Sequence, residues 1–215
     1  LVAHSGGTPI GLKTAYTYPE KIHAYVGVAQ IVNDYEQELL SYDFIVKEAA
    51  KSGAVKARKA IKVIGPPPYE EPEKIFMKAK YIVKYGGFIH RNATKRLIST
   101  YLNYLTSPEY SLKEGFRTMR GKGLDFTMNA RWEEIKNVDF TKEIETLNVP
   151  LYFFQGKYDM IVPTVQVQNY YNALKAEKGK KLIIFEDSAH VPMLEEKEKY
   201  EGFLINVVLK ETLSK

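Results

Sequence analysis

Apolar and polar positions follow the same pattern near both ends of the chain. Short apolar runs with the length of buried strands lie at residues 1–3, 23–31, 150–155 and 181–185. The segments between or after these runs have helical spacing and span residues 9–18, 164–176 and 195–209. Because strands separated by helix-length crossovers run parallel, the pattern predicts an α/β fold with a mostly parallel sheet and helices on both faces.

The middle of the chain, residues 34–137, is helical and irregular instead. Four stretches have helical spacing, at residues 35–50, 73–84, 93–105 and 112–118. Glycine and proline clusters interrupt the pattern at residues 65–68, 86–87 and 107–108. We therefore predict an inserted all-helical lid over residues 34–137, between two parts of one core at residues 1–33 and 138–215.

The composition is typical of a globular protein with a mixed surface. Hydrophobic residues make up 45% of the 215 positions, which is enough for a sizeable core. The net charge of +5 comes from 31 basic and 26 acidic residues scattered along the chain, so we expect no nucleic-acid partner. The absence of cysteine excludes disulfides and thiol chemistry, and it favours a cytoplasmic location. The chain opens on Leu1 without Met, so we expect upstream sequence, which leaves a signal or membrane anchor open.

A serine lies where the first strand gives way to the first helix, in Ala3-His-Ser-Gly-Gly7. This is the small-x-Ser-x-small form of a nucleophile elbow, in which Ala3 and Gly7 are expected to keep space open around Ser5. The N–H of Gly6 is expected to donate to a developing oxyanion. A glycine and serine turn without catalytic importance is the alternative. Pro9, in or just beyond the first helical turn, is expected to cost a hydrogen bond and loosen the elbow.

A serine nucleophile needs a base and an orienting acid, and both follow in later strand-end loops. Asp159 follows the strand at 150–155, and His190 follows the strand at 181–185. Either residue alone is more often a turn former or ordinary surface, but the order Ser, Asp, His after successive strands is specific. We predict Ser5, Asp159 and His190 as a catalytic triad. Asp187 is a rival acid, which we expect to brace the loop of His190.

The remaining histidines do not form a second pattern. His4 is expected to pack under the elbow, and His23 and His90 have no nucleophile or acid pattern around them. No histidines have metal-ligand spacing, so we predict no metal and no cofactor.

Four segments carry a resemblance to a known family: Leu1-Val-Ala-His-Ser-Gly-Gly-Thr8, Tyr18-Pro-Glu-Lys-Ile22, Gly156-Lys-Tyr-Asp-Met-Ile-Val-Pro163 and Phe185-Glu-Asp-Ser-Ala-His190. The chain resembles the α/β-hydrolase superfamily, and within it the proline iminopeptidase group. The resemblance implies attack by Ser5, an acyl-enzyme and hydrolysis by water, on a small-molecule or short-peptide substrate. A carboxylesterase or lipase-like hydrolase, and a non-catalytic binding protein that keeps the fold, are the alternatives.

The resemblance also suggests substrate-binding residues in the lid. Acidic lid residues receive the amino terminus of substrates in iminopeptidases, so Glu133 and Glu134 are candidates, although a solvated helix face is the alternative. Tyr69 and Tyr104 are candidates to line the pocket, although aromatic residues at helical spacing are more often core.

The resemblance further implies that this is the C-terminal part of the fold. Further strands, with the second oxyanion donor, would precede Leu1. We therefore expect residues 1–215 alone to have weak or absent activity, because losing one such donor costs about 10²- to 10³-fold in rate. We also expect either self-association through the exposed edge of the first strand or poor solubility.

Overall fold

The computed structural model describes residues 1–213, without the side chains of residues 93–96, 100, 101, 104, 119, 122, 124, 125, 127, 128 and 131. Its sheet is parallel, in the order β1-β2-β3-β4. The strands are β1 (Val2–His4), β2 (Tyr25–Val28), β3 (Leu151–Gly156) and β4 (Lys180–Phe185). The predicted α/β fold with a parallel sheet is confirmed.

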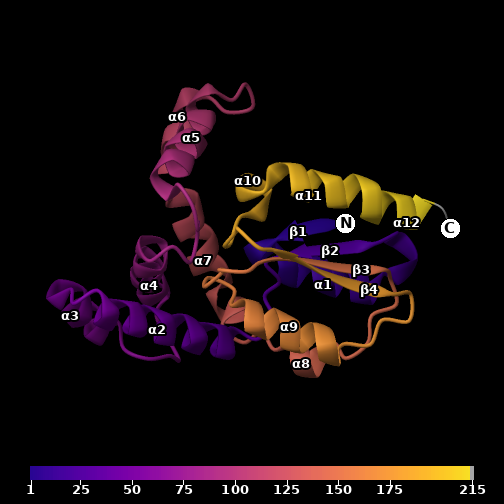
Figure 1. The fold of residues 1–215 in the computed structure, drawn as a ribbon, viewed down its shortest axis with the longest axis horizontal. Coiled ribbons are helices and arrows are strands. Elements are labelled where there is room, and N and C mark those ends of the chain that lie inside the picture. The colour runs from indigo at the N-terminus through magenta and orange to yellow at the C-terminus, as the bar shows by residue number, and fades with distance from the viewer. Residues whose placement is uncertain (214–215) are drawn as a thin grey trace.

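Helices cover both faces of the sheet (Figure 1). One face packs against α1 (Thr8–Thr17), α8 (Phe140–Glu143) and α9 (Thr164–Ala173). The other packs against α11 (Lys197–Phe203) and a π-helical stretch, η3 (Leu204–Leu209), which α10 (Pro192–Glu195) precedes and α12 (Lys210–Leu213) follows. The sequence pattern predicted one helix over 195–209, which the structure divides among these elements.

Strand β3 shows why its residues form a central strand. All six of its residues are buried, as expected for a parallel strand covered on both faces. Successive side chains point to opposite faces. Phe153 therefore packs toward Tyr170 of α9, with ring centroids 6.1 Å apart, and Phe154 packs edge-on against Tyr200 of α11 at 5.6 Å.

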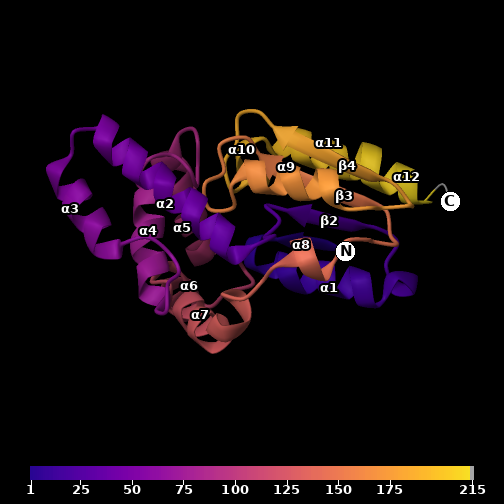
Figure 2. The same ribbon diagram turned by 90° about the horizontal axis from the view of Figure 1, so that it is seen from below.

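The helical segment after β2 forms a separate layer at the carboxyl ends of the strands (Figures 1 and 2). Its helices are α2 (Asp34–Lys51), α3 (Val55–Ile64), α4 (Pro72–Lys84), α5 (Ala93–Thr106), α6 (Leu112–Met119) and α7 (Lys122–Ile135). Helices α3 and α7 were not predicted. In the lysine-rich α3, apolar residues alternate with basic ones, and three of them, Ala57, Ile61 and Ile64, are buried in the lid core. Helix α7 starts after Gly121 and contains a second glycine, Gly123, which weakens any helical pattern.

The lid leaves and re-enters the core at adjacent points. Asn33 and Asp139 form an antiparallel bridge. The N–H of Asp34 donates to the carbonyl of Val138 at 3.0 Å, and that of Phe140 donates to the carbonyl of Val32 at 2.8 Å. The two connections therefore lie side by side at the edge of the core.

Among residues 1–213, none of the helices combines the length and apolar character that a bilayer crossing requires.

Candidate active site

Ser5 lies directly after β1 on a strained turn. Its φ is +51°, in the left-handed region that non-glycine residues rarely adopt. The turn continues as η1 (Ser5–Gly7) into α1. The hydroxyl of Thr8 donates to the carbonyl of Ser5 at 2.6 Å and accepts from the N–H of Ile31 at 3.0 Å. Because Thr8 is fully buried, these bonds fix the turn to the loop after β2.

The small residue that close packing at the elbow requires is Gly11, and not Gly7 as predicted. A Cβ added to Gly7 would meet no atom within 4 Å, so steric crowding does not require glycine there. A Cβ on Gly11 would lie 2.7 Å from the Cβ of Ala3 and 2.9 Å from the ring of Tyr25. The close approach is therefore between β1 and α1 at Ala3 and Gly11.

Pro9 lies in the first turn of α1, where an N–H has no intrahelical partner, so the predicted loss of a hydrogen bond was wrong.

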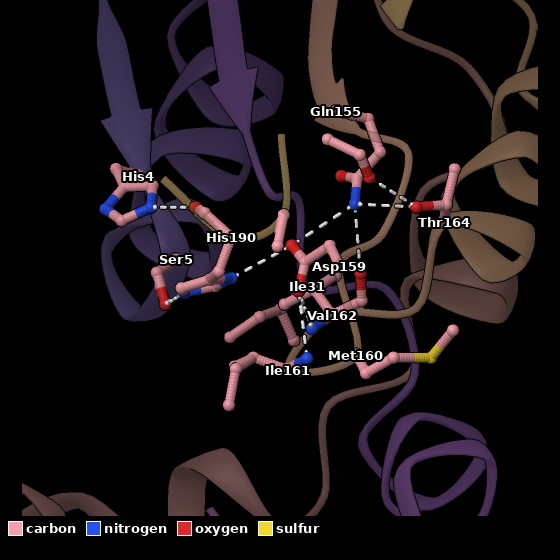
Figure 3. A network of polar contacts seen from close by, with 12 residues as sticks. His4, Ser5, Ile31, Gln155, Asp159, Met160, Ile161, Val162, Thr164 and His190 are labelled. Atoms are coloured by element: carbon pink, nitrogen blue, oxygen red, sulfur yellow. Dashed lines mark hydrogen bonds and ion pairs between the residues drawn. The ribbon is translucent and has the colours of Figure 1, made fainter. Parts of the chain in front are cut away.

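The structure brings Ser5, His190 and Asp159 together in one hydrogen-bonded chain (Figure 3). The hydroxyl of Ser5 lies 2.8 Å from Nε2 of His190. Nδ1 of His190 lies 2.9 Å from Oδ2 of Asp159. In this arrangement Nδ1–H donates to the carboxylate and leaves Nε2 to accept from the serine, which is the geometry of a general base.

Asp159 is fully buried, and its carboxylate is held by several donors. Oδ1 accepts from the backbone N–H groups of Ile161 and Val162, both at 2.9 Å. Oδ2 accepts from Nε2 of Gln155 at 3.3 Å in addition to His190. A buried carboxylate with this many donors is compensated for lost water and keeps one orientation.

The backbone of His190 is also held on both sides. Its N–H donates to the carbonyl of Phe88 in the lid, and its carbonyl accepts from Nε2 of His4, each at 3.0 Å. Burial, followed by the nearby His190, lowers the pKa of His4. His4 is therefore favoured as a neutral donor, and it lies against the ring of His190 with centroids 5.0 Å apart.

The rival acid, Asp187, does not contact the imidazole of His190. Its carboxylate pairs with Arg91 of the lid at 2.7 Å. Nδ1 of His190 is bonded to Asp159 instead.

The predicted substrate-binding residues do not gather around Ser5. Glu133 and Glu134 are exposed at the end of α7, and Glu133 pairs with Lys136 at 2.9 Å. Both glutamates line an open cavity of about 570 Å³ against α1, and its described lining does not include the triad. Tyr69 is buried in the lid core, where its hydroxyl donates to the carbonyl of Gly65 at 3.1 Å. The side chain of Tyr104 lies outside the described residues.

Several residues that support the site were missed in the sequence. Gln155 had a visible signal, because it is the polar residue at the end of the apolar run Leu151-Tyr-Phe-Phe-Gln155. Thr8 is three residues after the serine, a spacing typical of a turn. Phe88 had no signal, because its contact with His190 joins residues about 100 positions apart.

Among the side chains that the structure describes, no group of three or more His, Asp or Glu residues is placed to hold a metal ion.

Comparison with solved structures identifies the fold. The proline iminopeptidase-related protein TTHA1809 from Thermus thermophilus matches 99% of this chain over 64% of its own, with a TM-score of 0.56 and 16% identity. A thermophilic esterase from Thermogutta terrifontis matches 99% of this chain over 65% of its own, with a TM-score of 0.54 and 14% identity. The fold is that of an α/β-hydrolase.

Sequence relatives point in the same direction. The chain is 28% identical over 209 residues to the Bacillus subtilis protein "Probable aminopeptidase YbaC", covering 95% of this chain and 63% of that protein. It is 42% identical over 66 residues to a proline iminopeptidase from Saccharolobus solfataricus, covering 31% of this chain and 20% of that enzyme. No family model matches the chain. The chain thus has the α/β-hydrolase fold and is similar in sequence to a probable aminopeptidase and a proline iminopeptidase, and it spans less than two thirds of the length of these two relatives.

Proposed function

We propose that this chain belongs to a serine hydrolase that cleaves an ester or amide bond through an acyl-enzyme. The observation that carries the proposal is the hydrogen-bonded chain from Ser5 through His190 to the buried Asp159. His190 Nε2 would accept the hydroxyl proton as Ser5 Oγ attacks the carbonyl carbon. The imidazolium, oriented and stabilised by Asp159, would then donate that proton to the leaving amine or alcohol.

The acyl-enzyme would be hydrolysed by the reverse use of the same groups. His190 would accept a proton from water, which attacks the acyl carbon, and would return that proton to Ser5 Oγ. We assign the N–H of Gly6, the residue after the nucleophile, as one donor to the oxyanion in both steps.

A fluorophosphonate probe tests the nucleophile. The probe should label residues 1–215, and the Ser5→Ala variant should lose the label. The matched control is Ser52→Ala, because Ser52 lies at the end of α2 and belongs to the lid. Labelling that survives in Ser5→Ala, or no labelling of any form of the protein, contradicts the proposal, and the second outcome favours a binding protein.

For the substrate, we propose the amino-terminal residue of short peptides, with proline at that position as the first candidate. The two named sequence relatives, a probable aminopeptidase and a proline iminopeptidase, support this choice. Carboxyl esters are the second candidate, because an esterase shares the fold. Hydrolysis of Pro-anilide and other aminoacyl anilides is expected to exceed hydrolysis of short acyl esters. Hydrolysis of esters alone would remove the peptidase assignment.

We also propose that residues 1–215 alone turn over slowly. The chain spans 63% of the Bacillus relative, and within the described residues Gly6 is the oxyanion donor that we assign. A single donor leaves the developing charge less stabilised, so probe labelling without rapid turnover is expected. A kcat of about 10 s⁻¹, the ordinary enzyme range, would contradict this.

A further inference from the structure

One lid segment, residues 86–91 between α4 and α5, contacts both loops that carry the acid and the base. We call this segment the latch, residues 157–163 the acid loop and residues 186–191 the base loop. The carbonyl of Gly87 accepts from the N–H of Met160 in the acid loop at 2.9 Å. The carbonyl of Phe88 accepts from the N–H of His190 in the base loop at 3.0 Å. Neighbouring latch residues therefore hold both loops.

Side chains of the latch add contacts to the same two loops. The ring of His90 stacks on Tyr158 of the acid loop, with centroids 3.5 Å apart and planes within 2° of parallel. Arg91 pairs with Asp187 of the base loop. The fit is close at Gly87, because a Cβ there would lie 2.7 Å from the Cβ of Met160. The latch is thus seated tightly against the acid and base loops.

Glu195, at the end of α10, joins the latch to the base loop through one carboxylate. Oε1 accepts from the N–H groups of His90 at 2.8 Å and Arg91 at 3.2 Å. Oε2 accepts from the N–H of Ala189, the residue before His190, at 2.7 Å. Hydrogen bonds from backbone N–H groups to a carboxylate are charge-assisted, and they are stronger than hydrogen bonds between neutral amide groups.

The next residue, Glu196, provides a natural comparison. Its Oε2 accepts from the N–H of Asp187 at 3.0 Å and the hydroxyl of Ser188 at 2.7 Å. Its Oε1 bonds to Lys199 of α11 at 3.3 Å. These bonds fasten the base loop to α11, whereas those of Glu195 fasten it to the lid.

We propose that Glu195 is a positioning residue that couples the seating of the latch to the placement of His190. The proposal rests on His190 acting as the base of the proposed hydrolase. When the latch is seated, Glu195 holds the backbone N–H of Ala189 and the carbonyl of Phe88 holds the backbone N–H of His190. When the latch leaves, Glu195 loses two donors and His190 loses the acceptor for its N–H. Lid position thereby sets the geometry of the Ser5–His190 contact.

Hydrogen exchange of Glu195→Gln and Glu196→Gln tests the coupling. The glutamine amide turns one acceptor into a donor that faces a backbone N–H, so Glu195→Gln breaks one side of the bridge. We expect exchange to rise about 10- to 100-fold in both the latch and the base loop in Glu195→Gln. In Glu196→Gln it should rise in the base loop alone. Exchange in β3 is the internal reference for global destabilisation.

The rate of fluorophosphonate labelling gives the functional readout. Glu195→Gln should slow labelling of Ser5 about tenfold or more, without the loss seen in Ser5→Ala. Unchanged exchange in the latch of Glu195→Gln, or equal loosening of the latch in Glu196→Gln, would overturn the proposal. A wild-type protein that fails to label would contradict the proposed function. Hydrogen exchange does not require a reactive serine, so the exchange comparison still decides the role of Glu195 in that case.

Discussion

Three charged side chains are buried together in the lid, at Asp34, Glu38 and Lys78. Lys78 forms an ion pair with Glu38, which leaves Asp34 as the second carboxyl beside one ammonium group. Burial, followed by the neighbouring Glu38, raises the pKa of Asp34 to about 7 despite the opposing effect of Lys78. Asp34 is also the first residue of α2, so the raised pKa lies where the lid leaves the core.

Replacing Asp34 by Asn should remove a pH-dependent loss of stability. Since its folded pKa is about 7 and a free Asp titrates near 4, the folded state binds more protons than the unfolded state in that window. Asp34 therefore lowers the free energy of unfolding as pH rises from about 4 to about 7, and the effect levels off above. Urea unfolding should show Asp34→Asn gaining on the wild type by on the order of 2–4 kcal/mol between pH 4 and pH 8. Asp43→Asn, an exposed position on the same helix, is the control and should show no such gain.

Replacing Asp159 by Asn should nearly abolish labelling of Ser5 while the protein stays folded. An amide donates where His190 Nδ1–H needs an acceptor, so the imidazole would turn to the wrong tautomer. We expect a loss of about 10³- to 10⁴-fold in the labelling rate. Asp187→Asn is the matched comparison, because that carboxylate pairs with Arg91 and not with His190, and it should lose far less of the rate than Asp159→Asn. Equal losses in both variants would contradict the assignment of the acid.

At the scale of elements, packing of α1 on β1 decides how the elbow is held. The contact between Ala3 and Gly11 brings the helix close to the strand. Behind the elbow, the hydroxyl of Tyr25 donates to Oε1 of Gln30 at 2.7 Å and lies 3.2 Å from the carbonyl oxygen of Thr8. Burial raises the pKa of Tyr25 well above its usual value, so it remains a neutral donor. The elbow therefore depends on residues outside its five-residue motif.

Gly11→Ala should destabilise the protein, whereas Gly7→Ala should not. The new Cβ at position 11 would overlap Ala3 and the ring of Tyr25, and overpacking of this kind costs about 1–3 kcal/mol. Gly7 has φ −83° and open space around its Cβ position, so alanine there should change stability by less than about 0.5 kcal/mol. Thermal unfolding of the two variants measures the difference. A larger loss from Gly7→Ala would restore the role that the sequence motif suggested.

Local patterns predicted the strands, the crossovers and the positions of Ser5, Asp159 and His190, because each lies at the end of an apolar run. They did not predict what surrounds these residues. Glu195 looks like any surface glutamate in a charged stretch, and its role depends on a lid segment 104 positions away. Tyr69 was a candidate for the pocket, but the lid has an apolar core of its own, which is where the structure places that ring. The spacing of apolar residues along the chain carries no information about contacts between distant segments.

At the scale of the whole molecule, the two edges of the sheet differ. β4 carries Lys180 and Lys181, and charged side chains on an edge strand oppose pairing with another chain. β1 carries Val-Ala-His, and Leu1 and Val2 are about half exposed. We therefore propose that residues 1–215 self-associate through the β1 edge.

Val2→Lys should shift residues 1–215 toward the monomer. A lysine on the β1 edge would oppose pairing between two such edges by charge repulsion. Val165→Lys is the control, since Val165 is similarly exposed but lies on α9. Sedimentation velocity at several concentrations measures the result. A wild-type chain that stays monomeric, or equal effects of the two lysines, would contradict association through this edge.

Because the chain enters and leaves the lid side by side, at Asn33 and Asp139, the whole lid is inserted into the core at a single point. A segment whose ends already lie together can be replaced by one of different length without moving the strands beneath it. The free-energy cost of a change in lid length at this junction is therefore expected to be small. The latch sets the condition for such an exchange. A lid from another protein that lacks a counterpart of residues 86–91 would leave the core folded, but the N–H of His190 would lose its acceptor, the carbonyl of Phe88.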